Sequence, residues 1–239
     1  MRLGAVLGLV AAAICALPVV GAALRTGDIL VTGEVGDPFI GPVTGKIREF
    51  APDGTLVQEF TVLGLELKFS PAGILHVAAF SRVERFAGNG SLMSPILNPA
   101  PEYPIVSLAF DQAGNLFAGT RYGNVLKFGS DGALLATFAP GTVGFGLYDL
   151  GTDGCTLYYF NPTNKIGRFD VCTGLLKSSL TTSIPEIGYK VFVLPDGTLL
   201  ASTAPPTGMY RVQTDGTVIR RYTTAGTPYS LDLDRIFCG

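Results

Sequence analysis

The stretch IVSLAFDQAGNLFAGTRYGNVLKFGSDGALLATF (105–138) carries the pattern that decides the fold. It holds four apolar runs of strand length, at residues 105–111, 115–120, 124–129 and 133–138. Gly114 and Gly132 stand in the turns after the first and third runs, and glycine accepts the positive φ that tight hairpin turns require. We therefore expect four consecutive antiparallel strands, named A to D in chain order.

The same unit recurs along the chain at intervals of about 40 residues. The C–D turn repeats at Gly54, Gly90, Gly132, Gly174 and Gly216. The A–B turn repeats at Gly73, Gly114, Gly154 and Gly197, and Gly27 takes the same place in GDILVTG (27–33). Four short strands in each unit of about 42 residues indicate a β-propeller blade. The sequence therefore predicts an all-β propeller of four-stranded antiparallel blades.

The two ends of the repeat region decide the blade count. The first unit lacks an A strand, and YSLDLD (229–234) resembles a lone A strand after four complete blades. We expect this C-terminal strand to pair with the N-terminal B, C and D strands, which closes a ring of about five blades. The alternative is a six-bladed propeller whose last blade is truncated, and the abrupt ending RIFCG (235–239) leaves it open.

Residues 1–23 have the features of a signal peptide. Arg2 supplies the positive start, residues 3–20 are almost entirely apolar, and Gly21, Ala22 and Ala23 are small residues of a cleavage site. A membrane anchor is the alternative, because the apolar run is long enough to span a bilayer. We expect cleavage, a propeller domain over 24–239, a secreted or periplasmic location and no membrane attachment after cleavage.

Composition narrows the function classes. The 239 residues are 47% hydrophobic and 15% charged, which is too apolar for a disordered chain and too weakly charged for a coiled coil. The net charge of −2 lacks the basic footprint of nucleic-acid binding, so we expect no nucleic-acid partner. The single histidine, His76, leaves little for histidine-based metal sites or catalytic triads. We expect it to be a strand residue that faces a neighbouring blade.

Two cysteines flank one predicted hairpin. Cys155 opens a B strand, Cys172 ends the following C strand, and the loop NPTNK (161–165) joins the two strands. Counting outward from the loop places the cysteines nearly opposite each other, at a plausible disulfide distance. In an exported chain we expect them to be bonded, with two free thiols as the alternative. Cys238 would then be left over, free or in an intermolecular bond.

Two segments, FDQAGNLFAGTRYGNVLKFGSDG (110–132) and LGTDGCTLYYFNPTNKIGRFDVCTG (150–174), resemble NHL-repeat propellers. They are also similar to the gluconolactonase and senescence-marker propellers, which usually have six blades. The resemblance covers roughly residues 27–234 and, as a repeat pattern, specifies fold better than activity.

The lactonase branch of this family implies a divalent cation in the central channel, held by a Glu, an Asn and an Asp that precede three A strands. These places fall on Gly64 or Leu65, on Gly146 and on Tyr189, with Glu66 close to the first. Hard cations need converging oxygen ligands, so we expect no metal and no cofactor; Ca²⁺ or another divalent cation enters only under a lactonase alternative. The antibiotic-lyase propellers, another relative, depend on a catalytic histidine, whereas His76 lies inside a predicted B strand.

Propellers usually bind at one end of the channel, where the D–A and B–C loops meet. Glu66, Arg121, Tyr189 and Tyr229 lie near the starts of A strands, and we expect them at this channel mouth. They suit a small molecule, a glycan or a peptide, although they could also be ordinary solvated loop residues. We therefore expect a monomeric binding or scaffold module that is not an enzyme. A lactonase-like hydrolase and a truncated inactive relative are the alternatives.

Overall fold

The computed structural model describes residues 23–35, 44–101, 103–141, 147–161, 163–185, 188–203 and 208–223. The signal-peptide prediction for residues 1–23, apart from Ala23, lies outside this part of the chain, as do Tyr229 and Cys238. Within it, no helix is long and apolar enough to cross a membrane.

The described residues form five antiparallel sheets, one for each predicted blade. Blade 1 holds β1 (Ile29–Val35), β2 (Thr44–Phe50) and β3 (Leu56–Phe60). Blade 2 holds β4 (Leu67–Phe69), β5 (Leu75–Ala79), β6 (Arg82–Phe86) and β7 (Leu92–Leu97). Blade 3 holds β8 (Ile105–Phe110), β9 (Leu116–Thr120), β10 (Val125–Phe128) and β11 (Leu134–Phe138). Blade 4 holds β12 (Tyr148–Leu150), β13 (Thr156–Phe160), β14 (Ile166–Asp170) and β15 (Leu175–Leu180). Blade 5 holds β16 (Gly188–Val193), β17 (Leu199–Thr203), β18 (Gly208–Val212) and β19 (Val218–Thr223).

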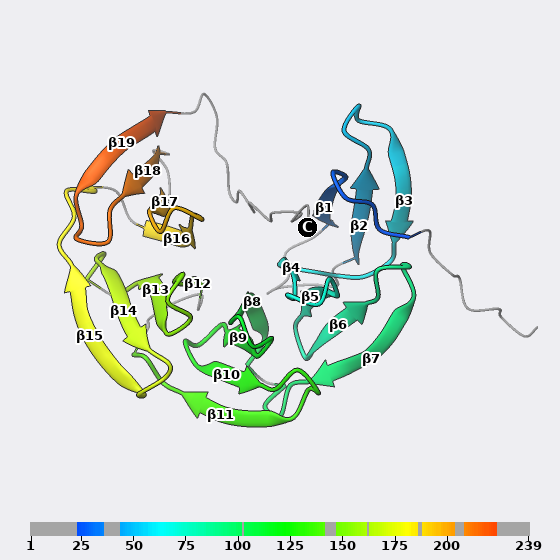
Figure 1. Cartoon of the computed structure of the whole chain (residues 1–239), viewed down its shortest axis with the longest axis horizontal. Coiled ribbons are helices and arrows are strands. Elements are labelled where there is room, and N and C mark those ends of the chain that lie inside the picture. Colours follow the sequence, from blue (N-terminus) through cyan, green and yellow to red (C-terminus); the bar gives the residue numbers. More distant parts are fainter. Residues whose placement is uncertain are drawn as a thin grey trace, which may run out of the picture.

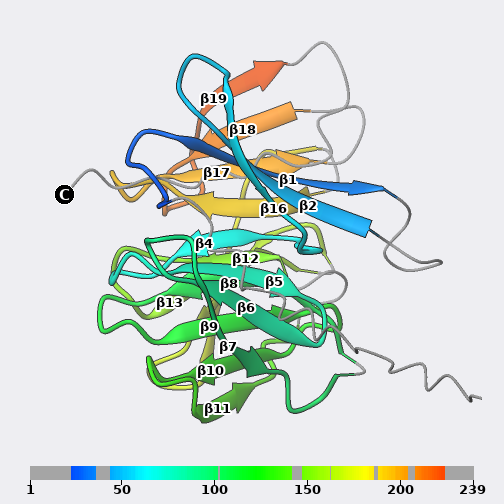
Figure 2. The same cartoon turned by 90° about the vertical axis from the view of Figure 1, so that its right-hand side faces the viewer.

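The sheets are arranged as the blades of a propeller, which confirms the predicted fold (Figures 1 and 2). The A strands β4, β8, β12 and β16 lie toward the centre, and the D strands β7, β11, β15 and β19 lie on the outside (Figure 1). Strand β9 is buried along its whole length, whereas β11 is mostly exposed or half-buried. The inner strands are covered on both faces by neighbouring blades and therefore carry few charged residues, which explains the low proportion of charged residues in the sequence.

The turn glycines behave as the repeat pattern predicts. All ten have positive φ, between 68° for Gly154 and 98° for Gly216. In blade 3, the Gly114 N–H donates to the carbonyl of Asp111, which closes a tight turn that a residue with a side chain would strain. In every blade the pairing of the C strand with the D strand also shifts register near its middle or end, as at a β-bulge.

Four hydrophobic cores join consecutive blades. The core between blades 2 and 3, for example, packs Ala78 and Val83 against Ile105, Leu108 and Phe128. Equivalent cores join blades 1 and 2, blades 3 and 4, and blades 4 and 5. Within the part of the chain that the structure describes, no such core joins blade 5 to blade 1.

The predicted ring closure lies outside the described residues, because it depends on residues 229–234. No closure is evident among the residues that are described, and blade 1 has three strands there. The carboxylate of Asp28, at the start of β1, is buried and has one oxygen without a hydrogen-bond partner among these residues. Pairing of the C-terminal strand with blade 1 stays a prediction.

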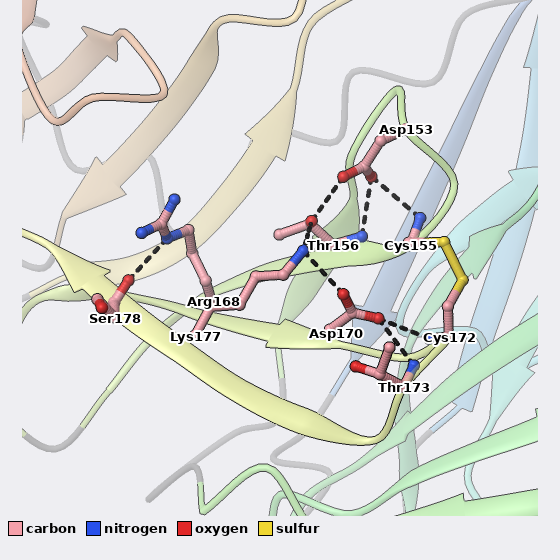
Figure 3. A network of polar contacts seen from close by, with 9 residues as sticks. All are labelled: Asp153, Cys155, Thr156, Arg168, Asp170, Cys172, Thr173, Lys177 and Ser178. Carbon is pink, nitrogen blue, oxygen red and sulfur yellow. Dashed lines mark hydrogen bonds and ion pairs between the residues drawn. A yellow bond between two sulfur atoms is a disulfide. The ribbon is translucent and has the colours of Figure 1, made fainter.

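The predicted disulfide is present in blade 4. Cys155 and Cys172 are bonded, with a Cα–Cα distance of 5.3 Å (Figure 3). Polar contacts brace this end of the blade: the Asp170 carboxylate accepts the N–H of Cys172 and forms an ion pair of 2.9 Å with Lys177. The Lys177 hydrogen bond, aided by the Thr173 N–H, lowers the pKa of Asp170 to about 2. The disulfide and its neighbours therefore act as a structural staple.

Candidate binding channel

The structure places three of the four predicted site residues. Glu66 directly precedes β4 and is buried, whereas Tyr189, on β16, keeps 38% of its surface exposed. Arg121 follows β9 and is half-buried, and its N–H donates to the carbonyl of Pro104 at 2.7 Å. Tyr229 lies outside the described residues. These positions belong to blades 2, 3 and 5, on different sides of the centre (Figure 1).

Glu66 is buried and forms an ion pair within the chain, and its predicted role in ligand binding stays a prediction. Its carboxylate lies 2.8 Å from the Lys190 ammonium, and the two side chains are only 2% and 7% exposed. The other carboxylate oxygen accepts the Leu108 N–H at 3.2 Å. Lys190 also lies over the ring of Phe192, 4.7 Å from its centroid. A buried carboxylate is stable only when a cation and hydrogen bonds compensate for its lost hydration. The contacts of Glu66 with Leu108 and Lys190 therefore link blades 2, 3 and 5 at the centre.

A second charged pair lies beside the first. The Lys68 ammonium, on β4, lies 3.7 Å from the Asp149 carboxylate, on β12. Both Asp149 oxygens also accept backbone N–H groups, one from Leu150 and one from Val193, each at 3.0 Å. Asp149 therefore connects blades 2, 4 and 5. The four predicted site residues did not include Lys68, Asp149 or Lys190, although a lone charge in each of three apolar A strands was a readable signal.

Tyr148 completes the polar centre. Its side chain is fully buried, and its hydroxyl lies near Ser107 without a hydrogen bond of ordinary geometry among the described residues. Burial raises the pKa of this hydroxyl well above its usual value, the Glu66 charge adds to the effect, and Ser107 opposes it. Tyr148 is therefore a neutral group at any physiological pH.

A cavity of about 690 Å³ opens at the end of the channel formed by the A–B turns, opposite the end that the sequence suggested. Its apolar lining includes Leu24, Phe69, Pro71 and Phe110. Its polar lining comes from Arg25, Thr26, Lys68, Ser70, Gln112 and Asp149. This volume lies within the range of small-molecule sites, which combine apolar walls with a few polar groups.

His76 supports the wall of this cavity. It is a buried residue of β5, as predicted, and its ring packs edge-on against Phe110 with centroids 4.8 Å apart. Its Nδ1 lies 3.0 Å from the Ile74 carbonyl. Burial lowers the pKa of His76 to about 4, with a smaller contribution from Arg85, although the contact with Ile74 opposes the change. The imidazole is therefore neutral near pH 7.

The residues of the channel do not fit the divalent cation that the lactonase resemblance implies. The one carboxylate close to the implied ligand positions, Glu66, faces the Lys190 ammonium at 2.8 Å. A cationic side chain at this place disfavours a second cation, and the other two implied positions offer no matching oxygen ligand. Cys155, Cys172 and Asp170 also lie within 4.8 Å of one another, but the two sulfur atoms are bonded to each other and are not thiolates.

Comparisons with known proteins support the fold. No protein-family model and no curated protein matches the chain. Among solved structures, it is similar to a protein of unknown function from Bacteroides caccae, at 15% identity and TM-score 0.63, over 82% of this chain and 73% of that one. It is similar to streptogramin B lyase, at 17% identity and TM-score 0.60, over 85% and 76% of the two chains. It also resembles a catalytically inactive histidine-to-alanine variant of virginiamycin B lyase from Staphylococcus aureus with quinupristin, at 15% identity and TM-score 0.59, over 83% and 75%.

These likenesses are distant, and at such identities they establish the β-propeller fold alone. They agree with the resemblance to repeat propellers noted in the sequence. They assign no activity to this chain.

Proposed function

We propose that the protein is an exported β-propeller that binds a small molecule in the cavity at the A–B turn end of its channel and catalyses no reaction. The observation that carries the proposal is the cavity itself, whose volume and mixed lining suit a small organic ligand. Of the classes considered from the sequence, a small molecule fits this volume best, and a glycan or a peptide is the alternative.

The chemistry of the channel supports binding over catalysis. General acid–base catalysis needs a group whose pKa lies near the working pH and which can reach the substrate. Glu66 is held by Lys190 and a backbone N–H, Asp149 accepts two backbone N–H groups, and His76 is neutral behind Phe110.

Membership of the NHL and gluconolactonase group, and export by the N-terminal 23 residues, belong to the same proposal. The repeat pattern and the disulfide support them, because disulfides persist in oxidising compartments. Mass spectrometry of the secreted protein tests export, with a new N-terminus expected after Ala23.

A matched pair of turn variants tests the binding site. Gln112 lines the cavity, whereas Ala113, the next residue of the same exposed turn, does not. Small molecules that bind the protein in a ligand-observed NMR screen should lose binding in Gln112→Trp and keep it in Ala113→Trp. Small molecules that still bind both variants would place the binding site elsewhere and overturn the proposal.

The non-catalytic part is tested separately. Lactone and ester hydrolysis by the purified protein, assayed with and without a chelator, should show no activity above that of a heat-denatured sample. Activity that disappears on chelation would instead support the lactonase alternative.

A further inference from the structure

We infer that the ligand of this cavity is an organic anion with a flat apolar body, its charge held by Lys68 and Arg25 and its body by Phe69 and Phe110. The inference rests on the proposed function and adds the chemical class of the ligand. It follows from the charges of the lining, the state of each charged group and the nature of the wall.

The cavity lining carries a net positive charge. Arg25 and Lys68 are its side-chain cations and Asp149 is the single carboxylate among the residues that line it, although the whole chain has a net charge of −2. Cleavage after Ala23 would add the α-ammonium of Leu24 to this lining. A positive lining on a weakly acidic protein attracts anions, because a concave site with apolar walls concentrates the field of its charges.

Asp149 offers little to a cationic ligand. Its two oxygens already accept the N–H groups of Leu150 and Val193, and its side chain is only 13% exposed. Lys68 lies 3.7 Å from this carboxylate, which is beyond hydrogen-bond distance. The ion pair of Lys68 with Asp149 is therefore longer than the 2.8 Å pair of Lys190 with Glu66, and both of its members line the cavity.

Arg25 sits on a fixed segment at the rim of the cavity. The Leu24 N–H donates to the Gly88 carbonyl at 2.8 Å, and the Arg25 N–H donates to the buried Glu49 carboxylate at 3.0 Å. These bonds hold residues 24–26 as one wall, opposite the turns of blades 2 and 3. The Glu49 contact uses the main chain of Arg25 and does not engage its guanidinium.

The apolar part of the ligand has a matching surface. Phe69 and Phe110 end the A strands β4 and β8, and both line the cavity together with Leu24. His76 packs behind Phe110 and is uncharged near pH 7, so it adds no charge that would favour water over an apolar group. Flat rings pack well against such aromatic walls.

Two fluorescent probes separate the charge from the apolar body. 8-Anilinonaphthalene-1-sulfonate carries a sulfonate on its naphthalene ring, and N-phenyl-1-naphthylamine has the same rings without the charge. We expect the sulfonate probe to bind the wild-type protein at least about tenfold more tightly than the neutral probe. A charge-assisted hydrogen bond in a partly buried site contributes an affinity difference of this size. Lys68→Met should lower its affinity about tenfold and leave that of the neutral probe unchanged.

Three controls separate loss of the Lys68 charge from other effects of the substitution. Lys165→Met removes the same charge from an exposed loop between β13 and β14, and it should change neither affinity. Near-UV circular dichroism must match the wild type in each variant, because loosened proteins bind the sulfonate probe nonspecifically. If Lys68→Met does not fold, Arg25→Met at the exposed rim gives the same readout.

Failure of the inference differs from failure of the proposed function. Equal binding of both probes, blocked by Gln112→Trp but insensitive to Lys68→Met and Arg25→Met, would overturn the anionic class and leave the cavity as the site. Binding that is the same in Gln112→Trp and Ala113→Trp would instead remove the cavity, and with it both proposals.

Discussion

Acidification should destabilise the protein through its single histidine. His76 is 5% exposed, and it lies opposite Lys68 on β4 and Arg85 on β6 in the strand register. Its surroundings are thus apolar or cationic, which disfavours an imidazolium. The pKa of His76 is about 4 in the folded protein, against an ordinary value of 6.5.

The sign and size follow from proton linkage. Between pH 6.5 and pH 4 the unfolded chain binds a proton at this residue and the folded protein does not, so stability falls as the pH falls through this window. Because one pKa unit corresponds to about 1.4 kcal/mol, the loss reaches about 3 kcal/mol by pH 4 and about 2 kcal/mol by pH 5. Above pH 6.5 both states are neutral at His76 and the contribution is complete.

His76→Gln isolates this effect from the titration of carboxylates. Glutamine has a polar N–H group but cannot be protonated in this range. Urea unfolding at pH 7 and pH 5 should show the wild type losing about 2 kcal/mol more than the variant. NMR of the one imidazole should also give a midpoint near pH 4. A midpoint at 6 or above, or equal losses in the two proteins, would refute the reasoning.

Three further perturbations test the fold at other points. Lys190→Met should lower the free energy of unfolding by about 3–5 kcal/mol in urea, because it removes the ammonium 2.8 Å from the buried Glu66 carboxylate. The deficit should shrink as the pH falls and Glu66 gains a proton, and a constant deficit would argue against burial of the charge. Gly216→Ala should lower the free energy of unfolding by about 3 kcal/mol and Gly54→Ala by about 1 kcal/mol. Both glycines have positive φ, but only at Gly216 would the new Cβ lie 2.4 Å from a backbone oxygen, that of Thr181. Equal losses of stability in the two variants would contradict this contact. Reduction of the disulfide in blade 4, which joins cysteines 17 residues apart, should lower the free energy of unfolding by about 3 kcal/mol, and an unchanged urea midpoint in reductant would show that it contributes nothing.

The repeat could be read from the sequence because its signals are local. A glycine such as Gly114 marks its turn through its own backbone conformation, and the strands beside it follow from short apolar runs. The disulfide was predictable for the same reason: Cys155 and Cys172 lie across one hairpin, and counting from its loop fixes their register.

The candidate site could not be read in the same way, because it depends on contacts between distant blades. Glu66 and Lys190 belong to blades 2 and 5, and nothing in either segment specifies the other. A repeat pattern places a residue at a position within its blade, but the packing of blades decides which charges meet at the centre. Sequence reasoning therefore found Glu66 and interpreted it as a ligand-facing group, whereas the structure gives it a partner from the same chain.

The two charged pairs also restrict where a ligand can bind. Glu66 directly precedes β4 and Lys68 lies within it, and they pair with Lys190 and Asp149 on two other blades. Removing a buried charge from its partner is costly, so a ligand that threaded the centre would have to replace both pairs at once. A ligand at the A–B turn end would meet only the Lys68–Asp149 pair, because Lys68 and Asp149 line the cavity and Glu66 and Lys190 do not. The cost of separating these pairs therefore favours binding on the side of the centre where Lys68 lines the cavity.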